Sequence, residues 1–412
     1  MTDVLQKGIT PSGLKILMLC WEYPPNVVGG LSRHVFGLSV HLAKAGHQVH
    51  VITASIEGLT PFEIIDGVHV HRVKPVNGDD GDFLAWIAGL NLAMAFMGDK
   101  LNGGMKFDLI HAHDWLVGAA AIVLKDSLGV PVLSTIHATE HGRNNGIHTE
   151  FQRFIHEREQ QLISESQYLI VCSDYMKQSL TTVFSVTPNK LSVIPNGVGT
   201  STSVQVMVEE IFPSLSQRKY IFSIGRMVKE KGFETIMEAA AIAKQRKLDY
   251  FFVIAGKGPM LLEYKKQVEQ QGLTDFVEFI GFVTDVQRNS LIAGCEMAVF
   301  PSLYEPFGIV ALETMIFGKP TIVSNTGGLK GIVKHLKTGL LMNPGNAESL
   351  LNQAAYLMEN PKISKEIGSR GRQIALSLYG WKRIANETGK LMEDIVLGMQ
   401  VHGDEETFTM KS

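Results

Sequence analysis

The sequence predicts an α/β fold with two Rossmann-like domains, each built on a parallel β-sheet flanked by helices. Short apolar runs rich in Val, Ile and Leu alternate with longer segments of helical period, and this alternation is typical of such sheets. It occurs twice along the 412 residues. A chain of this length is about twice what one hydrophobic core usually organises. We therefore expect two domains of roughly 200 residues, with sheets facing each other across a cleft.

The first half of the chain holds six apolar runs that we interpret as strands. Between the first two runs, apolar residues recur at steps of three and four, as in a helix with one buried face. These residues are Leu31, Val35, Leu38, Leu42 and Ala45. The predicted strands are 15–20, 48–53, 108–112, 131–136, 168–172 and 191–194.

The second half repeats this scheme. Its predicted strands are 220–224, 250–255, 277–280, 297–300, 320–324 and 339–342, with helices between them such as 230–246 and 308–318. The segment between the halves holds Gly, Ser, Thr and Pro213 without a clear period, which is typical of a linker. The predicted organisation is a flexible N-terminus (1–14), an N-terminal domain (15–197), a linker (198–218), a C-terminal domain (219–380), a helix that crosses back to the N-terminal domain (381–400) and a flexible tail (401–412).

Composition excludes several classes of protein. With 45% hydrophobic and 19% charged residues, the chain suits a globular protein rather than a disordered one. Its net charge of -3 favours neither nucleic acid nor an anionic membrane surface as a partner. The three cysteines lie far apart in or beside apolar runs, which indicates reduced core thiols. No apolar run is long enough for a transmembrane helix, and residues 1–13 lack a secretion signal, so we expect a cytoplasmic protein.

Functional residues are expected just after strands, because open parallel sheets bind ligands beyond the carboxyl ends of their strands. The first strand leads into Gly29 and Gly30 at the start of the amphipathic helix. Paired glycines let backbone amides approach a phosphate or a sugar, although a simple tight turn explains the pattern equally well. The pattern matches neither a dinucleotide-binding loop nor a P-loop, so neither a dehydrogenase nor an ATPase is indicated.

Two strand ends in the second half carry charged residues. Arg226 and Lys231 follow the first of these strands and could hold a diphosphate, supplying the positive charge that a metal ion supplies elsewhere. A solvated charged turn is the alternative. Glu305 lies in the loop after the strand ending at Phe300, and Glu313 lies in the helix that follows. The two carboxylates could therefore bracket a ligand at the start of that helix.

Histidines gather at strand ends in the first half. His137 ends one predicted strand, and the segment 111–115 (His-Ala-His-Asp-Trp) ends the strand before it. A hydrogen-bonded structural histidine is the common alternative. A zinc site from His111, His113 and Asp114 lacks a cysteine or a distant fourth ligand. Such a zinc site is conceivable, but the pattern supports it only weakly. The Asp-x-Asp pattern at 80–82 follows no strand and indicates a solvent-exposed loop.

Taken together, these segments resemble the GT-B retaining glycosyltransferases of the group that contains family 4 and the glycogen synthases. The resemblance covers residues 15 to about 381 and rests on motifs in a fixed order. These are Gly-Gly-Leu at 29–31, His-Ala-His-Asp-Trp at 111–115, Thr-Ile-His at 135–137, Pro-Asn-Gly-Val at 195–198, Gly-Arg at 225–226 with Lys231, and the Glu305/Glu313 pair. Residues 135–143 and 22–25 resemble bacterial α-1,4-glucosyltransferases related to glycogen synthase.

The resemblance implies a role for each candidate residue. It implies a nucleotide diphosphate sugar as donor, a saccharide acceptor such as an α-1,4-glucan, and no metal or other cofactor. On the donor, Arg226 and Lys231 are implied to bind the diphosphate, Glu313 the ribose, and Glu305 the hydroxyls of the hexose. His137 is implied to lie beside the anomeric carbon, and Glu22 and Asp114 to line the acceptor side. Backbone amides are implied to face the phosphates and the sugar near Gly29, Gly30, Phe307, Gly308 and Ile309. One departure is the segment 199–203 (Gly-Thr-Ser-Thr-Ser), where related sequences carry an acidic residue and an aromatic one.

The same resemblance implies transfer with retention, and the absence of an obvious nucleophile favours same-face attack over a covalent intermediate. Three alternatives stay open at this stage. The acceptor could be a lipid-linked or cell-wall saccharide, which would put the protein at the membrane periphery. The chain could instead be a nucleotide-sugar epimerase or a catalytically silent binding protein. The sequence indicates neither the donor base nor the oligomeric state.

Overall fold

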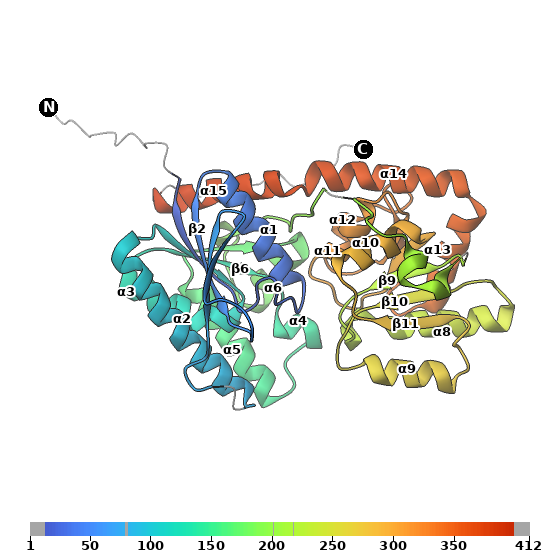
Figure 1. Ribbon diagram of the computed structural model, residues 1–412, viewed down its shortest axis with the longest axis horizontal. Helices are drawn as coiled ribbons and strands as arrows, with labels where there is room; N and C mark the ends of the chain where they lie inside the picture. The colour runs from blue at the N-terminus through green and yellow to red at the C-terminus, as the bar shows by residue number, and fades with distance from the viewer. Residues whose placement is uncertain (1–12, 79–80, 201, 217, 399–412) are drawn as a thin grey trace. The chain divides into compact units, whose positions relative to one another are not determined.

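The computed structural model describes residues 13–78, 81–200, 202–216 and 218–398, which divide into two compact units (Figure 1). The first unit holds the described residues of Met1–Val171, Leu180–Ile194 and Trp381–Ser412, and the second holds those of Cys172–Ser179 and Pro195–Gly380. Each unit contains one sheet flanked by helices, and nearly all neighbouring strands are parallel. The predicted pair of Rossmann-like domains is therefore confirmed.

The first sheet has eight strands in the order β3-β4-β2-β1-β5-β6-β7-β8. All of its pairs are parallel except β3 with β4 at the edge. Every strand predicted in this half is present, but β3 and β4 were not predicted, because histidines alternate with valines in β4 and break up its apolar run. The strands are β1 (Lys15–Leu19), β2 (Gln48–Ala54), β3 (Phe62–Ile65), β4 (Val68–Val73), β5 (Leu109–His113), β6 (Val132–Ile136), β7 (Tyr168–Val171) and β8 (Leu191–Val193).

Local signals explain where several helices of this half begin and end. A capping box formed by Thr149 and Gln152 starts α5, and Gly129 ends α3 in a left-handed conformation. The helices are α1 (Gly30–Lys44), α2 (Phe83–Met105), α3 (Gly118–Leu128), α4 (Glu140–Asn144), α5 (Glu150–Glu165) and α6 (Asp174–Val183), with short 3₁₀ turns η1 (Trp115–Val117) and η2 (Pro188–Lys190).

The last helix, α15 (Trp381–Val396), belongs to the first unit although nearly two hundred residues of the second unit precede it. Its buried Ile384 and Met392 join the core formed by β1, β2 and α1. Trp381 lies so close to α1 that a Cβ atom on Gly37 would stand 2.1 Å from its Cε2. The amphipathic pattern of α15 thus completes a core that begins near the N-terminus.

The second sheet has six parallel strands in the order β11-β10-β9-β12-β13-β14. All of the strands predicted for this half are present. They are β9 (Ile221–Ile224), β10 (Phe252–Ala255), β11 (Val277–Gly281), β12 (Met297–Phe300), β13 (Thr321–Ser324) and β14 (Leu340–Met342). The helices are α7 (Val208–Ile211), α8 (Phe233–Arg246), α9 (Leu261–Gln270), α10 (Asp285–Gly294), α11 (Ile309–Met315), α12 (Leu329–Ile332), α13 (Ala347–Glu359) and α14 (Pro361–Leu378), with 3₁₀ turns η3 (Pro213–Leu215) and η4 (Lys229–Lys231).

The segment predicted as a linker, 198–218, is more ordered than expected over its described part. It contains α7 and η3, and its Val208 and Leu215 are buried against Tyr220 and Phe222 in the second unit. The sequence showed no period here because elements of three or four residues are too short to display one. The predicted tail 401–412 and all but two residues of the predicted flexible N-terminus lie outside the described residues.

The three cysteines are buried, and none of them forms a disulfide, as the prediction of core thiols requires. Among the helices of the described residues, none is both long and apolar enough to cross a bilayer.

Candidate active site

A buried carboxylate in the loop between β12 and α11 is paired with a lysine from the end of another strand. Nζ of Lys231, in η4 after β9, lies 2.5 Å from Oε2 of Glu305. The hydroxyl of Ser302 donates a hydrogen bond to the same oxygen at 3.3 Å. Glu305 is only 7% exposed, and the lysine side chain is 23% exposed. The structure thus brings two predicted site residues together in a partly desolvated ion pair.

A glycine pair after β13 holds the backbone of this loop. Gly327 has a φ of 50°, and a Cβ atom on it would stand 2.0 Å from the carbonyl oxygen of Glu305. A Cβ atom on Gly328 would stand 2.3 Å from the carbonyl oxygen of Pro306. The N–H of Gly328 donates to the carbonyl of Glu305 at 2.8 Å. Because only glycine permits this close approach, the pair fixes where the Glu305 backbone lies.

The other two charged candidates of this unit have different partners. Arg226, whose side chain is 45% exposed, pairs with Glu230 one helical turn later at 3.0 Å. Glu313, in α11, accepts a hydrogen bond from Arg288 of α10 at 3.1 Å. Both side chains of that second pair are nearly buried. Glu313 is therefore held in one orientation by a neighbouring helix, whereas Arg226 lies at the surface.

The abrupt turn predicted before α11 is present. Gly308 precedes the helix with a φ of 116°, and a Cβ atom there would stand 2.5 Å from Cδ2 of Leu329. Phe307 is buried, with its ring 6.0 Å from that of Tyr379. The backbone through Phe307, Gly308 and Ile309 therefore has a conformation that glycine and close packing impose.

In the first unit, Glu22 binds the backbone of the loop that contains Gly29 and Gly30, which we call the glycine loop. Its carboxylate is 2% exposed and accepts hydrogen bonds from the N–H groups of Val28 at 2.5 Å and Gly29 at 3.1 Å. A longer bond comes from the N–H of Ser32 at 3.4 Å. Glu22 thus shapes the loop before Gly30 and α1, and one amide of the predicted Gly29/Gly30 pair is already occupied. Its predicted role on the acceptor side stays a prediction.

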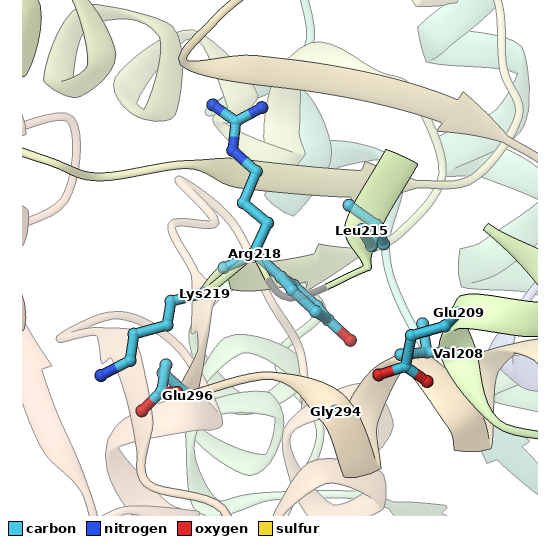
Figure 2. Close-up of a pocket in the computed structure, with 8 residues that line it drawn as sticks. Val208, Glu209, Leu215, Arg218, Lys219, Gly294 and Glu296 are labelled. Carbon is cyan, nitrogen blue, oxygen red and sulfur yellow. The ribbon is translucent and has the colours of Figure 1, made fainter. Parts of the chain in front are cut away.

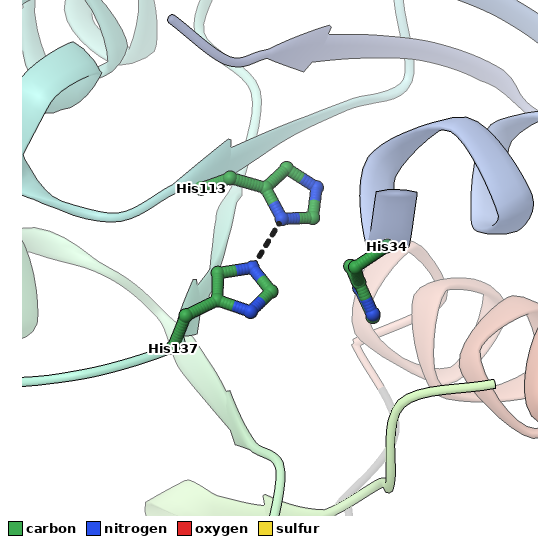
Figure 3. Close-up of side chains that lie close together, drawn as sticks. All are labelled: His34, His113 and His137. Atoms are coloured by element: carbon green, nitrogen blue, oxygen red, sulfur yellow. Dashed lines mark hydrogen bonds between the residues drawn. The ribbon is translucent and has the colours of Figure 1, made fainter. Parts of the chain in front are cut away.

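Histidines from three elements meet at the carboxyl ends of β5 and β6 (Figure 3). Nδ1 of His113 lies within hydrogen-bond distance, 3.1 Å, of Nε2 of His137. The ring of His34, from α1, stands 4.7 Å from that of His137 between centroids. His111 lies beside them and shares a hydrogen bond with Thr135. Burial lowers the pKa of His137 to about 3 and that of His113 well below its ordinary value, so these rings are neutral at neutral pH.

Asp114 positions His137 through the backbone. Its Oδ1 accepts the N–H of His137 at 2.7 Å, and the residue adopts a positive φ of 61° directly after β5. Burial raises the pKa of this carboxyl to about 6, while the hydrogen bonds from the backbone of His137 and Ala138 act in the opposite direction. The carboxylate therefore connects the ends of β5 and β6.

Comparison with known proteins agrees with this architecture. The family described as Glycosyl transferases group 1 matches residues 208–374, and Glycosyltransferase Family 4 matches residues 28–202. An uncharacterised glycosyltransferase of Methanocaldococcus jannaschii is 33% identical over 388 residues, covering 91% of this chain and 97% of its own. The chain belongs to the family 4 glycosyltransferases.

Two further relatives refine the comparison for this glycosyltransferase. A glycogen synthase of Mycobacterium tuberculosis is 31% identical over 398 residues, covering 92% of this chain and 94% of its own. Sucrose-phosphate synthase from Thermosynechococcus elongatus has the same fold, with a TM-score of 0.81 at 23% identity, and the match covers 93% of this chain and all of that one. The predicted GT-B fold and glycogen synthase-like family are therefore confirmed.

Sequence reasoning missed three residues that the structure places in these groups. His34 lies on the buried face of α1, and a histidine among the apolar residues of that face is a sequence feature that could have identified it. Glu159 shows the same signal in α5, between the buried Ile155 and Leu162. Its Oε1 accepts the N–H of Glu140 at 2.8 Å, and burial raises its pKa to about 8. Arg288 gave no signal, because its contact with Glu313 depends on how α10 packs beside α11.

Other polar features lie apart from these groups. In the Asp-x-Asp pattern, Asp82 caps α2 by accepting the N–H of Leu84 at 3.0 Å, whereas Asp80 lies outside the described residues.

A pocket of about 240 Å³ beside α7 contains none of the predicted site residues (Figure 2). Its lining residues are Val208, Glu209, Leu215, Arg218, Lys219, Tyr220, Gly294 and Glu296.

Proposed function

We propose that this glycosyltransferase transfers glucose from a nucleoside diphosphate sugar to an α-1,4-glucan, with retention at the anomeric carbon. The Lys231–Glu305 pair is the observation that carries the proposal. In this partly desolvated pair, the lysine can bind the diphosphate of such a donor and the carboxylate can accept hydrogen bonds from its sugar hydroxyls. The 31% identity to a glycogen synthase over most of both chains supports glucan as the acceptor.

In this proposal, positive charge lowers the barrier. As the glycosidic bond breaks, the sugar becomes oxocarbenium-like and the departing diphosphate gains negative charge. Lys231 and Arg226 then bind the transition state more strongly than the ground state. Because lysine and arginine supply this charge, we propose that transfer needs no metal ion. Glu313, oriented by Arg288, is assigned to the ribose hydroxyls, and the amides near Gly308 and Gly30 to the phosphates and sugar.

The proposed reaction proceeds on one face of the sugar. The bond between the anomeric carbon and the diphosphate oxygen breaks, the acceptor hydroxyl oxygen bonds to that carbon, and the hydroxyl proton passes to the departing phosphate. His137, neutral at neutral pH, is proposed to lie beside the anomeric carbon, where a neutral ring does not repel the developing positive charge. Asp114 fixes the His137 backbone, and Glu22 fixes the glycine loop, so both act by positioning.

A donor and acceptor screen tests this function. The full chain is incubated with UDP-glucose or ADP-glucose, with and without maltooligosaccharides and with EDTA in parallel. We expect the oligosaccharides to lengthen by α-linked glucose at an unchanged rate in EDTA. A parallel incubation supplies a lipid-linked or cell-wall saccharide, and elongation of that saccharide alone would contradict the glucan acceptor. Formation of a β-linked product would refute retention. The buried thiols and soluble substrates favour a cytoplasmic reaction.

A further inference from the structure

Three imidazoles supplied by α1, the end of β5 and the segment after β6 converge in the first unit (Figure 3). One ring nitrogen from each of His34, His113 and His137 lies within 4.8 Å of the other two. We propose that these histidines bind a divalent transition-metal ion of the Zn²⁺ type. This site goes beyond the proposed transfer reaction, which uses no metal.

The spacing of two of the rings is close to that of metal ligands. Nδ1 of His113 and Nε2 of His137 are 3.1 Å apart. Two nitrogens that share a tetrahedral zinc ion at its usual bond length lie about 3.3–3.4 Å apart. The two nitrogens therefore need only a few tenths of an ångström of extra separation to share an ion, and the rings must rotate so that their lone pairs point at it. The ligand nitrogen of His34 lies within 4.8 Å of the other two, so His34 must also move closer to complete the set.

The surroundings of the rings also suit a metal. His113 is fully buried, and its Nε2 has no hydrogen-bond partner within the described part of the chain, so a small reorientation of the ring breaks no hydrogen bond on that side. All three ligands are imidazoles, the preferred donors for zinc, copper and nickel. Asp114 follows His113 directly and its carboxyl accepts the His137 backbone N–H, so the strand ends that carry two of the ligands are tied together. The fourth position is left for water or an exogenous ligand, as in three-histidine zinc sites.

A second group of histidines provides a matched comparison. His50 and His69 stack with centroids 4.4 Å apart, and Nδ1 of His50 lies 3.0 Å from Nε2 of His71. These rings come from the adjacent strands β2 and β4 and lie in nearly parallel planes. Within the residues that the structure describes, they do not form a set of three mutually close ligand atoms, whereas His34, His113 and His137 do. Residue type is thus the same in both groups, and only the geometry differs.

Metal binding has a consequence for catalysis, and this consequence alone rests on the proposed function. If His137 lies beside the anomeric carbon, an ion on its ring occupies space that the donor sugar needs. We expect micromolar Zn²⁺ to inhibit transfer and EDTA to restore it. Binding itself is measured without substrate, so a failure of the transfer assay leaves the test of the metal site intact.

The test is a titration of the full chain, without a histidine tag, with Co²⁺ followed by visible absorption. We expect one equivalent to give the intense bands of four-coordinate cobalt, and Zn²⁺ to displace it. His34→Gln and His113→Gln should each weaken binding by a factor on the order of 100, since loss of a direct ligand exceeds the tenfold to hundredfold loss typical of outer-shell changes. His69→Gln, in the comparison group, should bind as the unaltered protein does.

Circular dichroism establishes that each variant is folded. If a variant does not fold, the unaltered protein provides a second measurement: Zn²⁺ should protect His137 from carbethoxylation by diethyl pyrocarbonate, as mapped by mass spectrometry of peptides. Absence of one-equivalent binding at about 100 µM Co²⁺ or Zn²⁺ would overturn the proposal. So would undiminished binding in folded His34→Gln and His113→Gln, or equal loss in His69→Gln.

Discussion

Three buried glutamates in this glycosyltransferase are stabilised in two different ways. Glu305 and Glu313 each face a cation, Lys231 and Arg288 respectively. Glu159 instead accepts a backbone N–H, and burial raises its pKa to about 8. A buried carboxyl must be paired with a cation, hydrogen-bonded or protonated, because an isolated charge is costly away from water. The paired residues are therefore each held beside a cation and suited to binding, whereas Glu159 is neutral at neutral pH and structural.

Lys231→Ala is expected to lower kcat by a factor on the order of 100 or more, the usual contribution of an electrostatic transition-state contact. Arg226→Ala should act in the same direction. Steady-state kinetics with the preferred donor provides the measurement. Lys229→Ala removes the same charge from an exposed position in the same turn and should leave kcat within about threefold of the unaltered protein. A larger loss in Lys229→Ala than in Lys231→Ala would contradict the assignment of Lys231 to the diphosphate.

Glu159→Gln is expected to change how stability depends on pH. The unfolded carboxyl titrates near 4.5 and the folded one near 8, so the folded state binds more protons between these values. The contribution of Glu159 to stability is thus present below pH 4.5 and lost as the pH rises towards 8. Glutamine does not titrate. Relative to the unaltered protein, the variant should gain about 3.5 kcal/mol, or about 7–14 °C in Tm, between pH 5 and pH 8.

Thermal unfolding at the two pH values measures this difference. Gln160→Ala, an exposed and non-titrating position in the same helix, is the control and should show no pH-dependent change relative to the unaltered protein. A constant difference between Glu159→Gln and the unaltered protein from pH 5 to pH 8 would contradict the raised pKa.

At the scale of elements, short loops between strands and helices carry the candidate site. Glu305 and Lys231 come from the loops after β12 and β9, which are neighbouring parallel strands. His113 ends β5 and His137 follows β6, and these two strands are neighbours in the other sheet. Parallel pairing brings the carboxyl ends of adjacent strands to one edge, so residues far apart in sequence meet there. Glycines then set how closely the loops approach.

Gly327→Ala is expected to destabilise the protein by about 1–3 kcal/mol and to lower kcat about tenfold or more, because a Cβ atom at this position collides with the Glu305 carbonyl. Urea unfolding and steady-state kinetics measure the two effects. Gly331→Ala, in the adjacent α12, meets no atom within 4 Å and should change neither quantity appreciably. If Gly327→Ala retained full activity, the position of the Glu305 loop would not matter for transfer.

At the scale of the whole molecule, the two units are not continuous in sequence. The first unit is completed by α15, which follows the entire second unit along the chain. Ile384, Ala385 and Met392 of α15 are buried in a core that also contains Val35 and Leu38 of α1. Stability of the N-terminal sheet therefore depends on the C-terminal helix.

Ile384→Ala is expected to destabilise the first unit by about 2–5 kcal/mol, the usual cost of removing a fully buried aliphatic side chain. Hydrogen exchange followed by mass spectrometry should show faster exchange in β1 and α1, with peptides of β9 and β12 unchanged. Lys382→Ala, an exposed change in the same helix, is the control. Equal acceleration in both units would refute the assignment of α15 to the first core.

The fold was largely predictable from the sequence because its signals are local. Alternating apolar runs and helical periods predicted most strands, since a buried parallel strand must be apolar along its whole length. The exceptions were β3 and β4, where His69 and His71 interrupt the run, and the elements of 208–215, which are too short for a period. Glycines at special turns, such as Gly308, were also visible because few other residues tolerate their backbone angles.

The sequence by itself determined the fold class, the family resemblance and which strand ends carry polar residues, since these depend on residue type and order. The tertiary structure decided the partners: Glu305 with Lys231, Glu313 with Arg288, Glu22 with its own glycine loop, and His34 with His113 and His137. Partners depend on the angles and distances at which elements pack, to within about an ångström. Periodicity in one chain does not encode that geometry, because many packings satisfy the same pattern of apolar and polar residues.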